Sequence, residues 1–563
     1  MQTKHLTRCG HVDGVSHKTG ERSEVRRDPI WLRAGAFFRA PVLGAVAALV
    51  WLILRTGTRP TRITYPCQQA ALGSAAALFA VPILPAIARR FGRLARAQRP
   101  HPRVGATIVV VPVIVAVVAI GSTYLQPRVA ILDPPPDYHP EVFLVENVRG
   151  IQPGRFGGVD DLVTLMGLRG LKLYRSDTGT LVAGPDGLIE ADDVVLLKVN
   201  AQWPKRGGTN TDVIRGVMRV IVEHPDGFVG EIIVADNGQS VGSLNRTENN
   251  AEDISQSVQD VVNDFVGEGW QASTSLWDPL GPYLVEEYSE GDMTSGYVVN
   301  SAQDPDTGIK TSYPKFQSDF GTYVSYKNGI WSSQTQTYDL DKLVVINMPV
   351  FKTHFIYGIT AAVKNHMGVI TSRWGTDSHR SVGRGGMGTV LAEVRMPDLT
   401  IMDCIWILAR PGLGPGAPYD LADRVDRLVS GTDPLAIDVW ATKHIMIPRI
   451  IENGYSYSAY HDTQDPDNPD SVFQRYLSLS MNELLSAGIE TTNDYTAVRL
   501  YRWIGDLDRD GDTDLYDYLD FVSCVTDSGG TIGRGCEDAD FNTDERVDLV
   551  DYGALQTSFT GEL

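Results

Sequence analysis

Two series of acidic residues in the last sixty positions have the spacing of calcium ligands. Ca²⁺ takes about six to eight oxygen ligands, which one loop can supply from positions 1, 3, 5, 7, 9 and 12. The two series repeat at an interval of 34 residues, counted from Asp506 to Asp540. Their predicted ligands are Asp506, Asp508, Asp510, Asp512, Asp514 and Asp517 in the first loop, and Asp540, Asn542, Asp544, Asp548 and Asp551 in the second. We expect two Ca²⁺ sites, with a weaker second site because Glu545 replaces the turn-forming glycine that Gly511 supplies in the first loop.

Polar side chains also follow several apolar segments that have the length of buried strands. Lys198 and Asn200 close the segment 193–199, Asp236 and Asn237 follow 231–235, Lys352 and His354 follow 343–348, and Asp403 follows 399–402. Because open parallel sheets bind ligands beyond the carboxyl ends of their strands, we expect a site at this edge. Asp236 is equally suited to capping a helix. Lys198 is more informative, because a buried ammonium group needs a partner.

Residues 351–368 are the richest segment in functional side chains. Lys352, His354, Lys364, Asn365 and His366 all fall within it. Two lysines near a strand end suit an anionic group such as a carboxylate or a phosphate. A histidine can also move a proton or ligate a metal. The alternative is a structural network of ion pairs between these lysines and the aspartates.

The elements that position these residues alternate between strands and helices. Apolar strands are predicted at 129–132, 142–145, 194–199, 230–235, 343–348 and 399–402, with an amphipathic helix at 211–224. Such alternation predicts an α/β domain with a mostly parallel sheet over 128–502. Residues 239–340 are rich in Ser, Asn, Gln and Tyr and read as a β-rich insertion, with a helix at 251–267 and a hairpin at Asn328-Gly329.

The first 127 residues have the composition of a membrane region. Three apolar segments, 36–54, 70–88 and 104–121, each approach the ~20 residues that span a bilayer. Basic residues gather before the first segment and between the second and third, which predicts that both regions are cytoplasmic. Three spans then give a multi-pass protein of the bacterial inner membrane with its large domain outside the cytoplasm. If the third segment is not inserted, the large domain is cytoplasmic.

The net charge of −19 is unevenly distributed. Residues 1–127 hold seventeen basic against four acidic side chains, whereas residues 504–563 hold sixteen acidic side chains against three arginines. The acidic remainder argues against nucleic acid as a partner. The five cysteines form no CxxC motif, so no iron–sulfur cluster is expected. Cys524 and Cys536 lie between the calcium loops and are either disulfide-bonded or free thiols.

Residues 129–450 resemble the bacterial and archaeal family known as domain of unknown function 362. The resemblance rests on VVLLKVN (194–200), INMPVFKTHFIYGITAAVKNHMGVI (346–370), DLTIMDCIWIL (398–408), GLGPGAP (412–418) and SGTDPLAIDVWA (430–441). It implies that nine positions matter: Lys198, Asn200, Lys352, His354, Lys364, Asn365, Asp403, Asp433 and Asp438. We expect Lys352, His354, Lys364 and Asp403 to serve any catalysis and the other five to bind the ligand. Some relatives carry ferredoxin-type clusters, for which this chain lacks the cysteines.

Residues 504–563 resemble the type I dockerin repeat, in which two EF-hand-like loops each precede a short helix. The aspartates at position 12, Asp517 and Asp551, and the apolar pairs Leu515/Tyr516 and Leu549/Val550 carry this resemblance. It implies a cohesin-like or other cell-surface protein as a partner, although the helix starts lack the hydroxyl pairs that commonly bind cohesins.

The sequence therefore leaves two alternative functions. In the first, an extracytoplasmic α/β domain binds or acts on an anionic small molecule through its Lys/His/Asp site. In the second, the chain is a surface scaffold whose calcium module attaches it to another protein, with a weaker suggestion of a link to polysaccharides.

Overall fold

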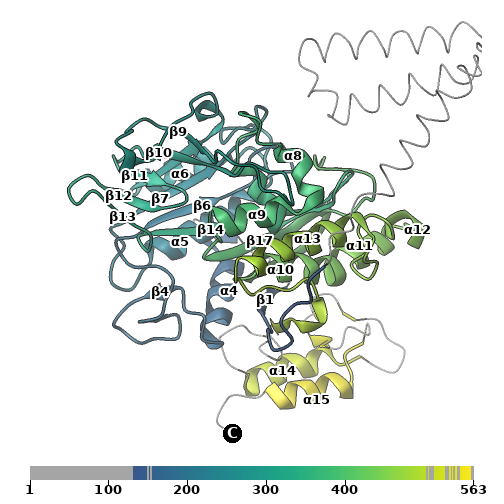
Figure 1. Cartoon of the computed structure of the whole chain (residues 1–563). Coiled ribbons are helices and arrows are strands. Elements are labelled where there is room, and N and C mark those ends of the chain that lie inside the picture. The colour runs from purple at the N-terminus through teal and green to yellow at the C-terminus, as the bar shows by residue number, and fades with distance from the viewer. Residues whose placement is uncertain are drawn as a thin grey trace, which may run out of the picture. The chain divides into compact units, whose positions relative to one another are not determined.

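The computed structural model describes residues 131–558, apart from 147, 149–150, 153–154, 503–504, 506, 508–512, 527–531, 534–535, 537–538 and 542–545. Within these residues, ten strands form one sheet in the order β19-β1-β18-β17-β14-β6-β7-β8, with β15 paired to β17 and β16 paired to β15 (Figure 1). Its strands are β1 (Glu141–Val145), β6 (Val194–Lys198), β7 (Glu231–Asp236), β8 (Ala272–Leu276), β14 (Leu343–Asn347), β15 (Val350–His354), β16 (Gly358–Thr360), β17 (Leu399–Leu408), β18 (Asp423–Gly431) and β19 (Arg499–Arg502).

The sheet has a hydrophobic core on each face, because successive side chains of a strand point to opposite sides. On β6, Val195 and Leu197 contribute to one core and Leu196 to the other. The first core contains the helices α4 (Gly157–Leu168), α5 (Thr211–Val222) and α6 (Val258–Gly267). The second contains α9 (Gly386–Glu393), α10 (Pro434–Ala441) and α13 (Val472–Ser486). The short helices are α7 (Ala362–Asn365), α8 (Ser378–Ser381), α11 (Ile447–Glu452) and α12 (Tyr457–Tyr460).

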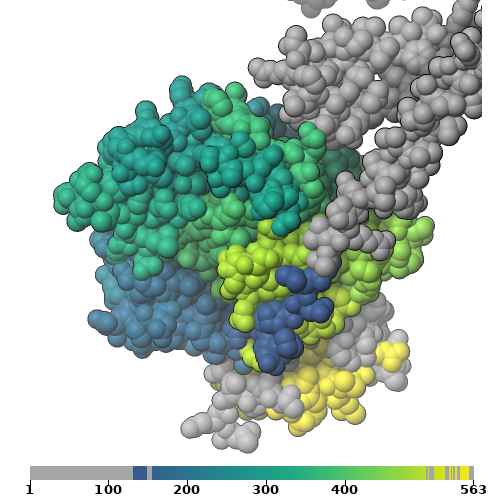
Figure 2. Space-filling model, in the orientation of Figure 1, coloured from purple at the N-terminus to yellow at the C-terminus, as the bar shows by residue number. Residues whose placement is uncertain are grey.

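A second, five-stranded antiparallel sheet is inserted between β8 and β14. It consists of β9 (Gly296–Val299), β10 (Ser312–Gln317), β11 (Tyr323–Ser325), β12 (Gly329–Ser332) and β13 (Thr337–Asp339). The turn between β11 and β12 contains Asn328 and ends at Gly329, whose φ of 91° favours glycine. Figure 2 shows this second sheet, in teal and green, within one continuous surface. Two smaller ladders pair β2 (Ile151–Gln152) with β3 (Arg155–Phe156), and β4 (Tyr174–Arg175) with β5 (Ala183–Gly184).

The predicted fold class needs two corrections. First, the large sheet is mixed: six of its nine ladders are parallel, but β17–β18, β1–β18 and β15–β16 are antiparallel. No helix stands between β17 and β18, so the chain returns directly alongside β17 instead of crossing over. Second, no helix in the described part of the chain is long and apolar enough to cross a membrane, so the predicted transmembrane helices are not supported. The three segments 36–54, 70–88 and 104–121 lie outside the described residues.

The C-terminal residues form a small helical module with its own core. Its helices are α14 (Leu515–Cys524) and α15 (Leu549–Ser558). The side chains of Phe521, Phe541, Val547 and Leu555 pack together between them. A disulfide joins Cys524 to Cys536, which decides between the two alternatives left open by the sequence.

Candidate functional site

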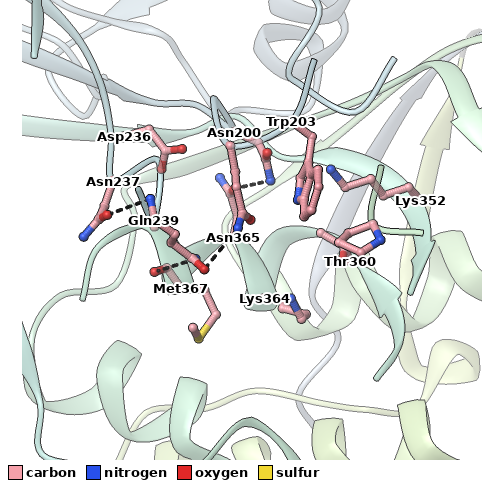
Figure 3. Close-up of a pocket in the computed structure, with 13 residues that line it drawn as sticks. Asn200, Trp203, Asp236, Asn237, Gln239, Lys352, Thr360, Lys364, Asn365 and Met367 are labelled. Atoms are coloured by element: carbon pink, nitrogen blue, oxygen red, sulfur yellow. Dashed lines mark hydrogen bonds between the residues drawn. The ribbon is translucent and has the colours of Figure 1, made fainter. Parts of the chain in front are cut away.

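A pocket lies beyond the carboxyl ends of the central parallel strands (Figure 3). The strands β14, β6 and β7 are adjacent and in register, with Lys198 opposite Asn347 on one side and Ala235 on the other. Their polar ends therefore meet at one edge of the sheet. A cavity of about 20 Å³ is lined by Asn200, Gln202, Trp203, Asp236, Asn237, Gln239, Lys352, Thr360, Lys364, Asn365, Met367, Gly368 and Pro415.

Lys198 and Asp236 form a buried ion pair at this edge. Nζ of Lys198 lies 2.7 Å from Oδ1 of Asp236, and the two side chains are 0% and 3% exposed. Burial lowers the pKa of Lys198 and raises the pKa of Asp236, because desolvation disfavours both charged forms. Gly368 passes so close that an added Cβ would lie 2.0 Å from Oδ1 of Asp236. The pair thus requires glycine at position 368.

Two further lysines reach the pocket without a carboxylate partner among the described residues. Lys352, on β15, is fully buried and donates a hydrogen bond to the carbonyl oxygen of Gly207. Burial, followed by the nearby charge of Lys364, holds the pKa of Lys352 well below its ordinary value. Lys364, on α7, has its Nζ 5.6 Å from the ring centre of Tyr357, and burial lowers its pKa to about 8. The pocket therefore holds two amines that lack a carboxylate partner among the described residues, and burial disfavours the charged form of both.

His354 lies near these lysines as a neutral imidazole. Its Nδ1 accepts the backbone N–H groups of Ile356 and Tyr357, at 3.1 and 3.2 Å. Burial and the charges of Lys364 and Lys352 hold the pKa of His354 far below its ordinary value. His354 is therefore uncharged at neutral pH. It does not belong to the residues that line the cavity.

Three predicted site aspartates act as backbone acceptors away from the cavity. Asp403, on β17, accepts the N–H groups of Asn210 and Ile405 and the side-chain amide of Asn250. Asp433 caps α10, as its side chain accepts the N–H groups of Leu435 and Ala436. Burial raises the pKa of Asp403 to about 7 and that of Asp433 to about 6.

The third aspartate, Asp438, fixes the helix that carries Lys364. Although it lies on α10, its two carboxylate oxygens accept the N–H groups of Ala362 and Val363, at 2.7 and 3.0 Å. These groups lie in the first turn of α7, where backbone N–H groups have no partner within the helix. Burial raises the pKa of Asp438 to about 8. Asp438 thus positions Lys364 and Asn365 without lining the cavity.

The structure places Asn200, Lys352, Lys364 and Asn365 in the lining of this cavity, and Lys198 reaches it through its ion pair with Asp236. Sequence reasoning missed Gln202, Trp203 and Gln239, which lie in loops after β6 and β7. It also missed Asn347, the last residue of β14, which the strand-end rule could have found.

The calcium prediction falls mostly outside the described residues. Asp506, Asp508, Asp510, Asp512, Asn542 and Asp544 are among those not described. The described aspartates repeat their contacts at the 34-residue interval. Asp517 accepts the N–H of Asp514 at 2.7 Å, and Asp551 accepts the N–H of Asp548 at 2.8 Å.

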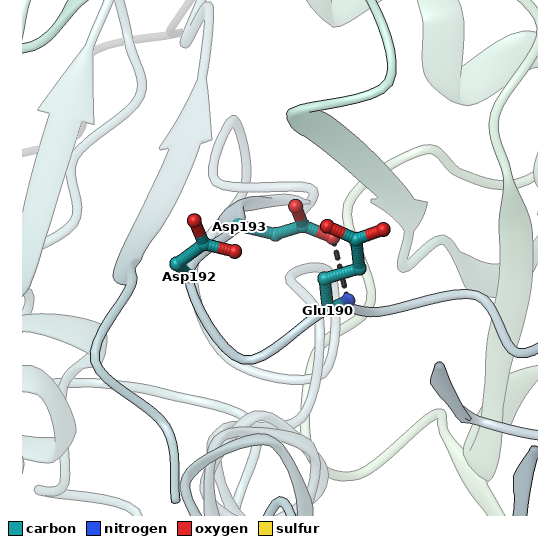
Figure 4. Close-up of side chains that lie close together, drawn as sticks. All are labelled: Glu190, Asp192 and Asp193. Atoms are coloured by element: carbon teal, nitrogen blue, oxygen red, sulfur yellow. Dashed lines mark hydrogen bonds between the residues drawn. The ribbon is translucent and has the colours of Figure 1, made fainter. Parts of the chain in front are cut away.

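One acidic cluster gathers elsewhere, formed by Glu190, Asp192 and Asp193 (Figure 4). Nζ of Lys342 lies 2.6 Å from Glu190 and from Asp192, and 3.3 Å from Asp193. The lysine offsets the charge that would otherwise attract a cation, so we treat this cluster as structural.

Comparisons with known proteins bear on part of the chain. No curated protein matches it, and the comparisons lend no support to the dockerin-like nature of the C-terminal repeat. A family model matches residues 323–443, a shorter region than the predicted 129–450. This region contains Lys352, His354, Lys364, Asn365, Asp403, Asp433 and Asp438, but not Lys198 or Asn200. Residues 323–443 match the model of the family described as "Domain of unknown function (DUF362)".

Proposed function

We propose that the α/β domain binds a small anionic molecule in the pocket that Lys352 and Lys364 line. The charge balance of the lining carries this proposal. Asp236 is the one carboxylate among the described lining residues, and it is already paired with Lys198. The two remaining lysines therefore lack a negative partner that a ligand can supply.

The alternative, a structural ion-pair network, needs an aspartate that faces these lysines. Asp403 and Asp438 both have their carboxylate oxygens engaged by backbone N–H groups instead. Two neighbouring amines away from water repel each other's protons, which is why the pKa of Lys352 is lowered by Lys364 as well as by burial. A carboxylate or phosphate would favour the protonated form of both lysines and accept charge-assisted hydrogen bonds from them.

Isothermal titration calorimetry of the full chain with acetate and with phosphate tests this proposal. Each charge-assisted hydrogen bond contributes about 1.5–3 kcal/mol, so Lys352→Met and Lys364→Met should each weaken binding roughly 10- to 100-fold. The exposed Lys327 of the second sheet provides the control, and Lys327→Met should bind normally. Thermal unfolding should show that the pocket variants remain as stable as the wild type. Loss of folding in both variants, or normal binding by both, would show that the lysines are structural.

A second candidate function concerns the C-terminal module, for which we propose calcium-dependent attachment to another protein. Two observations favour it. Asp517 and Asp551 are both fully buried carboxylates in a segment with a large excess of acidic residues, so the donor set fits a cation. Large apolar side chains lie exposed at the start of both helices: Leu515 63%, Tyr516 67%, Leu549 84% and Val550 62%. These pairs are related by the same 34-residue interval, and each gives its helix an exposed apolar start that suits a protein partner.

The disulfide adds information about where this module works. Disulfides form and persist in oxidising compartments, so we place the module outside the cytoplasm. A type I dockerin-like fold, with a cohesin-like or other cell-surface partner, is the finer form of this proposal. A pull-down from the cell envelope in millimolar calcium, repeated with Leu549→Asp, tests it. The proposal requires a partner that is recovered with calcium, is lost on chelation and is lost in the variant.

A further inference from the structure

A relay of amide side chains fixes the orientation of Asn200 at the pocket. Nδ2 of Asn365 donates to the backbone carbonyl oxygen of Lys198 at 3.2 Å and to Oδ1 of Asn347 at 2.8 Å. A carbonyl oxygen can accept but not donate, so Oδ1 of Asn365 must face the other way. There it accepts Nδ2 of Asn200, at 3.4 Å.

The same relay leaves one oxygen of Asn200 without a partner. Oδ1 of Asn200 is buried and has no hydrogen-bond partner among the described residues, although Asn200 lines the cavity. Rotating the amide by half a turn would bring its oxygen against Oδ1 of Asn365, which places two acceptors face to face. The pocket therefore presents an acceptor that the relay holds in place.

The chemistry of the missing partner follows from its surroundings. A buried acceptor requires a donor, and a carboxylate held by Lys352 and Lys364 can only accept hydrogen bonds. A cationic donor on the ligand is disfavoured by the same two lysines. A neutral hydroxyl group satisfies Asn200 without adding positive charge. The cavity volume of about 20 Å³ is room for about one water molecule, so the pocket must widen on binding and favours the smallest such ligand.

We propose that the ligand is a small 2-hydroxycarboxylate, whose carboxylate faces Lys352 and Lys364 and whose hydroxyl group donates to Oδ1 of Asn200. This inference rests on the proposed anion-binding function and adds the group that distinguishes one anion from another. The hydroxyl of Thr360 is also buried and without a partner, and it lines the same cavity. Thr360 is therefore the other residue that could accept the hydrogen bond of the ligand's hydroxyl group, and a test must distinguish it from Asn200.

Calorimetric titration of the full chain with glycolate, acetate and fluoroacetate tests the inference. Fluoroacetate has nearly the size of glycolate but has no O–H to donate, so it separates hydrogen bonding from shape. A site that hydrogen-bonds a substrate hydroxyl strongly rejects analogues that lack it. We expect glycolate to bind at least tenfold more tightly than acetate and fluoroacetate. This comparison uses the wild-type protein and does not depend on a variant that folds.

Asn200→Leu, which keeps the side-chain shape but removes the acceptor, should abolish the preference for glycolate. Asn263→Leu, at an exposed asparagine on α6, should keep it. Equal binding of the three acids by the wild type would overturn the inference while leaving the anion proposal intact. A preference that survives in Asn200→Leu would also overturn it and assign the hydroxyl to Thr360. If none of the three acids binds and phosphate does not bind either, the proposed function itself fails.

Discussion

Lys198 and Asp236 meet at the ends of two neighbouring strands, with Nζ 2.7 Å from Oδ1. Each of the two groups has a further hydrogen-bond partner. Nζ of Lys198 donates to the carbonyl oxygen of Val199, and Oδ2 of Asp236 accepts the N–H of Ala201, both at 2.7 Å. A buried ion pair persists when such bonds complete it. Because Lys198 already pairs with Asp236, the carboxylate that lines the pocket, Lys352 and Lys364 remain available to a ligand.

Gly368→Ala should destabilise the protein by about 3 kcal/mol, because the new methyl group would displace Asp236 from Lys198. Urea unfolding, followed by tryptophan fluorescence, measures the change. Gly267→Ala is the matched control, since a Cβ there meets nothing within 4 Å and Gly267 ends α6. The control should leave stability unchanged or raise it by up to about 1 kcal/mol. A Gly368→Ala protein as stable as the wild type would show that the ion pair tolerates displacement.

The affinity for an anion should decrease as the pH rises, and it should continue to decrease above pH 8. Free Lys364 has a pKa lowered to about 8, and a bound anion favours its protonated form, so binding at higher pH must take up a proton. Once Lys364 is neutral in the free protein, affinity for acetate should fall up to about tenfold per pH unit. Calorimetry in two buffers of different ionisation enthalpy detects the proton. Constant affinity from pH 7 to 9 would contradict the prediction.

The sequence predicts the positions of the central strands and hence part of the site. Apolar segments ending at Lys198 and at Asn347 become β6 and β14, because a fully buried strand must be apolar on both faces. The sequence pattern does not distinguish a polar side chain that faces a ligand from one that accepts backbone N–H groups. Asp403 follows an apolar segment as Lys198 does, yet it accepts the N–H of Asn210 from another part of the chain. Asp433 accepts N–H groups of the helix that it caps.

The loop residues of the pocket could not be predicted for a different reason. Trp203 and Gln239 follow β6 and β7 in segments without periodicity, and Gln239 has a φ of 51°, which few side chains adopt. Their place depends on contacts between loops, such as the hydrogen bond from Gln202 to Gln239 at 3.2 Å. The sequence did not predict that β18 pairs antiparallel with β17. This pairing depends on the connection after β17, which has no helical pattern.

Asp438 should make the protein less stable as the pH rises from about 4 to about 8. Burial raises the pKa of this carboxyl from 3.8 to about 8 in the folded state. Its contribution to stability is therefore complete below the unfolded pKa and is lost as the pH rises through the folded pKa, by about 1.4 kcal/mol per pH unit. Asp438→Asn removes this titration. Its stability should depend less on pH than that of the wild type, although Asp403 and Asp433 retain part of the dependence.

Urea unfolding at pH 4, 6 and 8 checks the prediction for Asp438. At pH 4 the variant should be about 1–2 kcal/mol less stable, because one amide oxygen replaces two acceptors for Ala362 and Val363. Asp226→Asn, at an exposed loop residue, is the control and should follow the wild type. Parallel stability curves for the wild type and Asp438→Asn would exclude Asp438 as the titrating group.

The full chain should bind two Ca²⁺ ions, and Asp517→Asn and Asp551→Asn should each remove one of them. Both residues hold position 12 of their loops, where a carboxylate gives the metal two oxygens and an amide gives one. The loss of one charged ligand should weaken its site by more than about tenfold. Native mass spectrometry counts the bound ions. Asp520 is an exposed residue on α14 that is not one of the predicted ligands, so the Asp520→Asn variant should still bind two Ca²⁺ ions. The contact between Asp514 and Asp517 is repeated between Asp548 and Asp551, so the two variants should behave alike. A variant that still binds both ions would exclude the loop that it alters as a calcium site.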